Sequence, residues 1–295
     1  MNLSDIGTIK QVLARHGFSF SKGLGQNFLI NPSVCPKMAA LCGADENTGV
    51  LEIGPGIGVL TRELSLVAKK VVSVEIDQRL LPVLSETLSD YDNITIVNAD
   101  ILKIDIEALI AEHFSDCTSV CVCANLPYYI TSPIIMALLE QKLPIDCITV
   151  MVQKEVAQRM CADIGSRESG AVTVAVHYFS EPELLFDVSR GSFMPAPNVD
   201  SAVLRLNIRK TPAVEVANEQ FFFKFVKAAF GQRRKTLVNA VSSGMNMEKG
   251  RILAAVQAAN LSDTVRAEAL TMQQLCDVCG NLYHKANSDL EETQL

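Results

Sequence analysis

The chain has 295 residues, 48% of them hydrophobic, and a formal net charge of −7. This length suffices for one large domain or two ordinary ones with a sizeable core. No uncharged apolar run of about 18 residues occurs, and the N-terminus lacks the features of a signal or transit peptide, so no membrane span or export is expected. Nine cysteines, several inside apolar runs, do not form a disulfide pattern in a chain this long. We therefore expect a cytoplasmic protein.

Between residues 48 and 153, short apolar runs alternate with stretches whose apolar residues recur at helical spacing. The runs predicted as strands are VLEI (50–53), KVVSVEI (70–76), NITIVNA (93–99), SVCVCANL (119–126) and CITVMV (147–152). The stretches predicted as helices are GVLTRELSLVA (58–68), QRLLPVLSETLSD (78–90), DIEALIAEHF (105–114) and SPIIMALLEQ (132–141). This alternation predicts an α/β fold, a parallel sheet with helices on both faces.

The pattern changes in the second half of the chain. AVTVAVHYF (171–179) and SAVLRLNIR (201–209) are predicted as further strands, forming an antiparallel pair at the edge of the sheet. After Pro212 the pattern is wholly helical, with predicted helices over 218–230, 232–243, 248–258 and 264–284. We therefore expect a domain over 1–211, which opens with a helical extension over 1–30, and a smaller all-helical domain over 212–295.

Charge is distributed unevenly along this acidic chain. The 31 residues from Arg205 to Lys235 contain eight basic and two acidic side chains, a local charge of +6. The remainder must then carry about −13, so a basic face able to contact nucleic acid is compatible with the negative total. An ordinary solvated helix face is the alternative explanation for such a cluster.

The stretch VLEIGPGIGVLTREL (50–64) is a strand, a glycine-rich turn and a helix. Glycines let the backbone approach a ligand closely, and the helix N-terminus offers free N–H groups. The loop has Gly54, Gly56 and Gly58 but not the G-x-G-x-x-G spacing of a dinucleotide fingerprint. Glu75 ends the next strand, 21 residues after Gly54, where a carboxylate can accept both ribose hydroxyls.

A third polar residue, Asp100 in NADIL (98–102), ends the third predicted strand. Its carboxylate could accept from the exocyclic amine of an adenine, with Ile76 and Ile101 on the two faces of the ring. Taken alone, Asp100 is more typical of a helix N-cap. Together with Gly54 and Glu75 it predicts a nucleoside pocket along the carboxyl ends of the strands.

The fourth strand ends in Asn125-Leu126-Pro127-Tyr128, beside that pocket. If the cofactor is S-adenosyl-L-methionine, this turn suits an amino group on a nucleic-acid base as the methyl acceptor. The Asn125 side-chain carbonyl and a backbone carbonyl next to Pro127 can each accept one N–H, which exposes the nitrogen lone pair. Tyr128 can stack on the extruded base, worth roughly 1–3 kcal/mol. Alignment of methyl group and nitrogen would supply much of the rate.

These motifs closely resemble the KsgA/RsmA ribosomal RNA adenine dimethyltransferases. The resemblance rests on NLPYY (125–129), LEIGPGIGVLT (51–61), VEID (74–77) and NADIL (98–102), and extends to KGLGQNFLIN (22–31), MVQKEVAQRM (151–160), FMPAPNVDSAVLRL (193–206) and FGQRRKTLVNAV (230–241). It implies a Rossmann-like class I methyltransferase sheet, S-adenosyl-L-methionine as cofactor, and dimethylation of two adjacent adenosines in the 3′-terminal hairpin of 16S rRNA within the small ribosomal subunit. We expect a monomer without a metal.

The same resemblance implies a role for individual residues. Gln26, Asn27 and Leu29 lie against the methionine end of the cofactor, with the loop of Gly54 and Gly56 beneath it. Glu75 holds the ribose and Asp100 the adenine, whose two faces Ile76 and Ile101 cover. Asn125, Leu126, Pro127 and Tyr128 position the acceptor, and Phe193 packs on the target base. Arg233, Arg234 and Lys235, predicted on a helix, are expected to contact the RNA backbone.

Several relatives and other classes remain as alternatives. Erm-type methylases act on large-subunit RNA and usually have isoleucine where this chain has Leu126. Mitochondrial transcription-factor relatives would carry a transit peptide, and DNA adenine methyltransferases lack the helical tail. A ribosome assembly factor that acts mainly by binding is a reading from a different class. A nucleotide-dependent oxidoreductase is disfavoured by the failed fingerprint and by the NLPY turn.

Two groups of residues typical of metal sites do not predict one. Cys276 and Cys279 have the spacing of half a zinc site but lack a second pair nearby, so buried cysteines on one helix are the better interpretation. Cys121 and Cys123 alternate along a strand and are expected to be small core residues.

Overall fold

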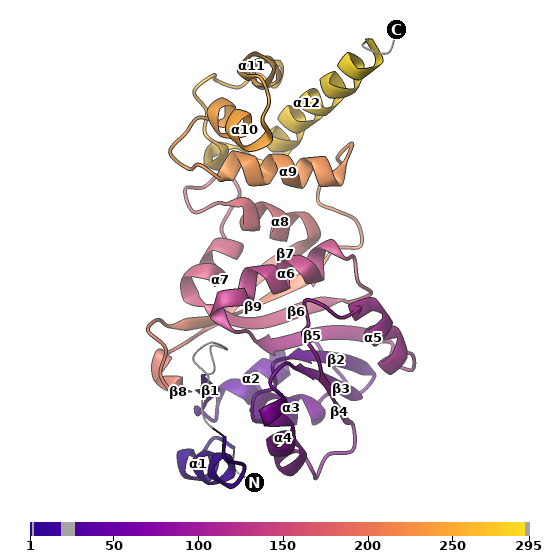
Figure 1. The fold of residues 1–295 in the computed structure, drawn as a ribbon, viewed down its shortest axis with the longest axis vertical. Helices are drawn as coiled ribbons and strands as arrows, with labels where there is room; N and C mark the ends of the chain where they lie inside the picture. The colour runs from indigo at the N-terminus through magenta and orange to yellow at the C-terminus, as the bar shows by residue number, and fades with distance from the viewer. Residues whose placement is uncertain (2, 19–26, 293–295) are drawn as a thin grey trace. The chain divides into compact units, whose positions relative to one another are not determined.

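The computed structural model describes residues 1, 3–18 and 27–292, with side chains as far as residue 284 (Figure 1). The chain divides into two compact units, Met1–Gln158 with Glu181–Ile208, and Arg159–Ser180 with Arg209–Leu295. Residues 159–180 therefore belong to the same compact unit as the C-terminal helices, as judged by their contacts. The division into functional domains at residue 212 stays a prediction.

The first unit is built on a seven-stranded sheet with the order β4-β3-β2-β5-β6-β9-β7. Its strands are β2 (Thr48–Ile53), β3 (Lys70–Glu75), β4 (Ile94–Asn98), β5 (Ser119–Asn125), β6 (Cys147–Gln153), β7 (Ser180–Val188) and β9 (Ser201–Ile208). The first five pair in parallel, and β9 runs antiparallel to β6. The predicted parallel sheet is confirmed, with strand boundaries within a few residues of those expected.

Helices cover both faces of this sheet. They are α1 (Ile6–Arg15), α2 (Val34–Leu41), α3 (Val59–Ser65), α4 (Leu81–Thr87), α5 (Ile106–His113), α6 (Thr131–Glu140) and α7 (Lys154–Met160), the last of which runs into the second unit. The side chains of α1 to α4 share one core with Val50, Val71 and Cys123 of the sheet. Gly49 faces the other way, and a Cβ there would lie 2.3 Å from the ring of Phe114, which directly follows α5. Alternation along the strand thus separates the two helical layers.

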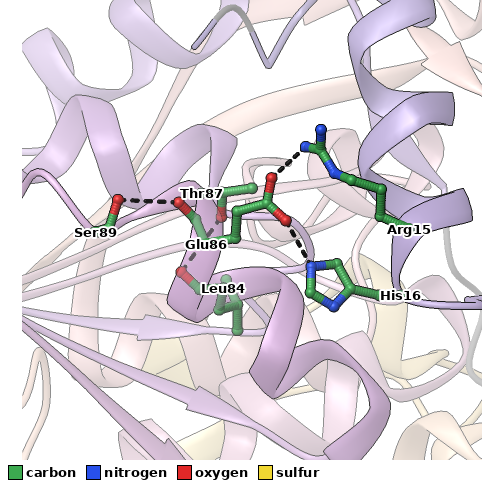
Figure 2. A network of polar contacts seen from close by, with 6 residues as sticks. All are labelled: Arg15, His16, Leu84, Glu86, Thr87 and Ser89. Atoms are coloured by element: carbon green, nitrogen blue, oxygen red, sulfur yellow. Dashed lines mark hydrogen bonds and ion pairs between the residues drawn. The ribbon is translucent and has the colours of Figure 1, made fainter.

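The N-terminal helix α1 is attached to α4 by charged side chains (Figure 2). The Glu86 carboxylate accepts from the guanidinium of Arg15 and lies 2.7 Å from Nε2 of His16. Ile9, Val12 and Leu13 of α1 are buried in the same core as α4. Apolar burial and a shared carboxylate therefore hold α1, which lies within the predicted extension over 1–30.

The prediction of a strand over 171–179 is wrong, because these residues form helix α8 (Ala171–Phe179). Most of its side chains are buried, so the sequence lacks the polar stripe that marks an amphipathic helix. The local signal that identifies the helix is its start, where the Gly170 N–H donates to the Thr173 hydroxyl at 3.0 Å. The edge strand next to β9 is β7, which begins at Ser180 instead.

The remaining helices of the second unit are α9 (Glu219–Phe230), α10 (Leu237–Met245), α11 (Lys249–Ala258) and α12 (Met272–Glu292), with a short 3₁₀ turn at Ala267–Ala269. The helical tail is confirmed, but two starts differ from prediction. The Thr236 hydroxyl accepts from the Asn239 N–H, so α10 begins at Leu237 rather than 232. Thr271 and Gln274 exchange hydrogen bonds of 3.0 and 3.2 Å, so α12 begins at Met272 rather than 264.

Buried aromatic rings form the core of the second unit. The ring of Tyr178 lies 4.9 Å from that of Phe179 and 5.7 Å from that of Phe222, centroid to centroid. Cys276 and Cys279 are buried on α12, as Cys121 and Cys123 are on β5, which confirms the prediction that these cysteines belong to the core. Within the described part of the chain, no helix is both long and apolar enough to cross a membrane.

One carboxyl group lies inside the sheet of the first unit. Glu52 of β2 is 1% exposed, and the Ser73 hydroxyl of β3 donates to it at 2.6 Å. Burial raises the pKa of Glu52 from 4.5 to about 7, because the ionised form is poorly solvated there. Folding therefore favours the protonated acid, and an ionised Glu52 opposes folding.

The sign of this effect predicts a pH-dependent stability. Ionisation of Glu52 lowers the free energy of unfolding. This loss is absent below about pH 4.5, grows as the pH rises, and reaches about 3 kcal/mol above about pH 7. We expect Glu52→Gln, which cannot ionise, to gain free energy of unfolding relative to wild type across this window, measured by urea titration. Glu107→Gln on the exposed side of α5 controls for net charge. A difference between Glu52→Gln and wild type that stays constant with pH would contradict the assignment.

Candidate active site

A pocket opens at the carboxyl ends of the parallel strands in the first unit. The empty space within it is about 1220 Å³, a volume that includes open solvent at its mouth. The predicted cofactor and acceptor residues that line it are Asn27, Leu29, Gly54, Gly56, Glu75, Ile76, Asp100, Ile101, Asn125, Leu126, Pro127, Tyr128 and Phe193. Gln26 lies outside the described residues. Motifs spread over 167 positions of sequence, from Asn27 to Phe193, thus meet in one cavity.

The glycine loop after β2 forms one wall of the pocket. Gly54 and Gly56 have φ angles of 70° and 60°, in the region that favours glycine. A Cβ at Gly54 would meet no atom within 4 Å, so the backbone there is open to a ligand. The Glu75 carboxylate ties the loop to the end of β3, because it accepts from the N–H of Asp77 at 2.8 Å and of Gly56 at 3.4 Å.

The charges around the pocket have one sign. Three carboxylates, Glu52, Glu75 and Asp100, line it, and no lysine, arginine or histidine does among the described residues. Burial raises the pKa of Glu75 as it does that of Glu52, because the ionised forms are poorly solvated there. A cation bound nearby would stabilise the ionised forms and lower both pKa values again. The pocket suits a positively charged ligand and disfavours a pyrophosphate.

Asp100 comes just after β4, where its carboxylate both closes a turn and lines the pocket. Its carboxylate accepts from the Leu102 N–H at 3.1 Å and lies 3.2 Å from the Lys103 ammonium. It therefore closes a turn, while the cap of the next helix is Asp105. The alternative interpretation of Asp100 as a helix N-cap is wrong, and its carboxylate still lines the pocket.

The NLPY turn places polar groups at the end of β5. Asn125 is in register with Met151 of β6, and the Leu126 N–H still donates to the Met151 carbonyl at 3.1 Å. Pro127, with φ −60° and ψ 130°, then turns the chain into a 3₁₀ helix over Tyr128–Ile130. Among the described residues, neither the Asn125 side chain nor the Leu126 carbonyl has a hydrogen-bond partner, so both acceptors are available to a substrate.

A two-stranded sheet, β1 (Phe28–Leu29) with β8 (Phe193–Met194), completes the pocket wall. Leu29 and Phe193 are direct cross-strand partners, and the Ile30 N–H donates to the Ser192 carbonyl at 2.8 Å. This pairing brings a residue expected at the cofactor next to one expected at the target base. The pairing of β1 with β8 was not predicted from the sequence, because a strand of two residues has no measurable periodicity.

Glu52 and Phe28 also line the pocket, although neither was predicted from the sequence. The signal for Glu52 is a carboxyl group inside an otherwise apolar strand, directly before the glycine loop. Phe28 has no comparable signal, because its place beside Gly56, 3.3 Å from where a Cβ would stand, depends on the tertiary contact.

Arg233, Arg234 and Lys235 lie in the second unit and are exposed, but the prediction that they sit on a helix is wrong. They occupy a turn between Gly231, which ends α9, and Thr236, which caps α10. The Arg233 guanidinium donates to the Arg167 carbonyl, which fixes one end of the turn.

Comparison with known proteins identifies the family of the chain. The ribosomal RNA adenine dimethylase model matches residues 17–283. Ribosomal RNA small subunit methyltransferase A of Bacillus pumilus is 48% identical over 280 residues, 94% of this chain and 96% of its own length. The protein of the same name from Bacillus licheniformis is 49% identical over 268 residues, 90% and 92% of the two chains.

Solved structures share the fold. The 23S rRNA methyltransferase ErmE superposes with a TM-score of 0.64 at 30% identity, over 87% of this chain and all of its own. A dimethyladenosine transferase from Plasmodium falciparum gives a TM-score of 0.69 at 24% identity, over 88% and 98% of the two chains. The motif resemblance is thereby confirmed: the chain belongs to the ribosomal RNA adenine dimethylase family and is an S-adenosyl-L-methionine-dependent methyltransferase.

Proposed function

We propose that the protein dimethylates N6 of two adjacent adenosines in the 3′-terminal hairpin of 16S rRNA, acting as a cytoplasmic monomer on the small ribosomal subunit. The observation that carries the proposal is the Asn125–Tyr128 turn, which lines a pocket with three carboxylates and keeps two acceptors without a partner among the described residues. The 48–49% identity to proteins named small subunit methyltransferases supports this target over the large subunit, since the similarity to ErmE is 30%.

The residues around the pocket fit the proposed cofactor. Bound S-adenosyl-L-methionine supplies a methyl group on a positively charged sulfur, and the carboxylates of Glu52 and Glu75 favour that charge. Glu75 would accept from the ribose hydroxyls and Asp100 from the adenine amine. Ile76, which is 51% exposed, and the buried Ile101 would cover the two faces of the ring. Asn27 and Leu29, with Gln26 before them, would lie against the methionine end.

The acceptor side follows from the unengaged carbonyls. The Pro127 carbonyl already accepts from the Ile130 N–H at 3.2 Å and the Thr131 hydroxyl at 3.1 Å, so the backbone acceptor next to Pro127 is that of Leu126. The Asn125 side chain and the Leu126 carbonyl would each accept one N–H of the target amine. Two such bonds direct the nitrogen lone pair toward the methyl group, where alignment lowers the barrier.

The target base would stack between aromatic side chains. Tyr128 is partly buried at the pocket wall, and Phe193 is 3% exposed and lines the same cavity. No strong general base is required, because the methylated nitrogen carries a positive charge and releases its proton readily to water. The protein thus binds, desolvates and orients the amine, and the same pocket must readmit the monomethylated base for a second transfer.

The basic turn offers a contact for the RNA backbone. Arg233, Arg234 and Lys235 present three exposed positive charges within three residues. Such a cluster binds phosphates and releases condensed counterions, so affinity falls with salt. We assign the turn to RNA binding and not to the reaction.

The proposed function is tested by incubating the protein with labelled S-adenosyl-L-methionine and unmethylated small and large ribosomal subunits. Mass spectrometry then identifies the methylated bases. Dimethyladenosine at two adjacent small-subunit positions is the expected product. Label confined to the large subunit would assign the protein to the Erm type. Stable binding of small subunits without label would leave an assembly factor and contradict the proposed reaction.

Asn125→Ala is expected to lower the methylation rate about 100-fold or more, because it removes an acceptor needed at the reacting nitrogen. Cofactor affinity, measured by calorimetry, should change little. Asn125→Asp keeps an acceptor oxygen in place and should retain more activity than the alanine variant. An alanine variant with wild-type rate would show that the amine is held by other groups.

Reversal of the basic turn to Arg233→Glu, Arg234→Glu and Lys235→Glu should weaken binding to small subunits and reduce its salt dependence, since fewer phosphates are neutralised. Filter binding over a range of KCl concentrations measures both. Lys10→Glu on the exposed side of α1 controls for net charge. Parallel loss of cofactor affinity would indicate misfolding, and unchanged RNA binding would remove the turn from the interface.

A further inference from the structure

Two buried hydroxyl groups contact the NLPY turn from outside the pocket lining. The Thr131 side chain, 2% exposed, donates to the Pro127 carbonyl at 3.1 Å. The Ser201 hydroxyl, 0% exposed, lies 2.6 Å from the Tyr128 hydroxyl. The first bond fixes the backbone of the turn and the second fixes the ring that it carries. Neither residue lines the pocket, so both act through a neighbour.

The Ser201 hydroxyl is held by the sheet and not by a loop. Ser201 begins β9 and is in register with Gln153 of β6. The preceding Asp200 is fixed twice, since its carbonyl accepts from the Lys154 N–H at 3.0 Å and its carboxylate from the Arg190 N–H at 2.9 Å. The hydroxyl therefore presents a stationary partner to a ring mounted on a single 3₁₀ turn.

The Tyr128 ring has two side-chain torsions, and stacking alone does not require its hydroxyl group. A hydrogen bond from that hydroxyl to a stationary partner selects one orientation of the ring plane before the base arrives. Burial raises the pKa of Tyr128, so the phenol keeps its proton and can donate over the usual assay range. The adjacent Tyr129 is 57% exposed, which shows that the turn itself does not enclose an aromatic ring.

Thr131 acts on the acceptors. Its hydroxyl and the Ile130 N–H together occupy the Pro127 carbonyl, so the proposed backbone acceptor is the carbonyl of the neighbouring pocket residue Leu126. Without the Thr131 bond, the turn between Pro127 and α6 retains only one hydrogen bond at this carbonyl. Positions of reacting groups must hold within a fraction of an ångström for a near-attack geometry.

We propose that Thr131 and Ser201 are positioning residues, which preorganise the Asn125–Tyr128 turn and the Tyr128 ring for the target adenine. This inference rests on the proposed function of the turn. It extends that function to two side chains that touch neither cofactor nor base.

The test measures kcat and the KM for S-adenosyl-L-methionine on unmethylated small subunits. Thr131→Val removes the hydroxyl at nearly constant volume, and Thr131→Ser keeps it. We expect kcat of Thr131→Val to fall about 3- to 10-fold, the effect of one lost hydrogen bond, with an unchanged KM and with recovery in Thr131→Ser. Equal rates for valine and serine variants would remove Thr131 from the proposal.

For Ser201, a double-mutant cycle separates positioning from packing. Ser201→Ala and Tyr128→Phe should each lower kcat about 3- to 10-fold, and the double variant should be no slower than either one. Additive losses would overturn the link between the two hydroxyls. If Ser201→Ala does not fold, Tyr128→Phe removes the same bond from the other side, and a wild-type kcat for it would overturn the inference.

A matched control is Ser180→Ala, which deletes a buried hydroxyl that donates to the Val176 carbonyl at 2.7 Å in the second unit. It should lose thermal stability as Ser201→Ala does but keep its kcat. An equal fall in kcat would reduce the Ser201 effect to general destabilisation and overturn the inference. Failure of the proposed function would be distinct, because wild-type protein would then label no small-subunit adenosine.

Discussion

The parallel sheet is the constraint on which the rest of the site depends. Parallel strands end at one edge, so the residue after each strand reaches the same cavity whatever its distance in sequence. Gly54 and Asp100 come just after β2 and β4, Glu75 and Asn125 are the last residues of β3 and β5, and all four line one pocket. In the proposed function, the carboxylates of Glu75 and Asp100 would favour a cationic nucleoside, and the amide of Asn125 would accept from an amine beside it.

Charge decides between chemistries that share this architecture. Dinucleotide sites neutralise a pyrophosphate, whereas here carboxylates line the described part of the pocket without a basic side chain. Three of the basic residues concentrated over 205–235, Arg233, Arg234 and Lys235, lie on the turn between α9 and α10, in the second unit. The residues proposed to bind the cofactor and those proposed to contact RNA thus carry opposite charge, which is compatible with a net charge of −7 on a nucleic-acid enzyme.

Side chains behind the pocket set its precision. Ser73 stabilises Glu52, the Asp77 N–H holds Glu75, and Thr131 and Ser201 hold the NLPY turn. These contacts join residues up to 73 positions apart, as between Tyr128 and Ser201. Each is an ordinary serine, threonine or backbone group, without a motif to identify it before the fold is known.

The sequence by itself determined the strand and helix order over 48–153, the motif residues that meet in the pocket, and the family, because strand periodicity and loop motifs are local properties. It misassigned 171–179, since a helix with most side chains buried lacks a polar stripe. It also placed Arg233–Lys235 on a predicted helix over 232–243, whereas α10 begins only after the Thr236 cap. Only tertiary structure decided the pairing of Leu29 with Phe193 and the hydroxyl contacts at Pro127 and Tyr128. Those contacts arise between distant segments, and no local pattern encodes which partners the fold brings together.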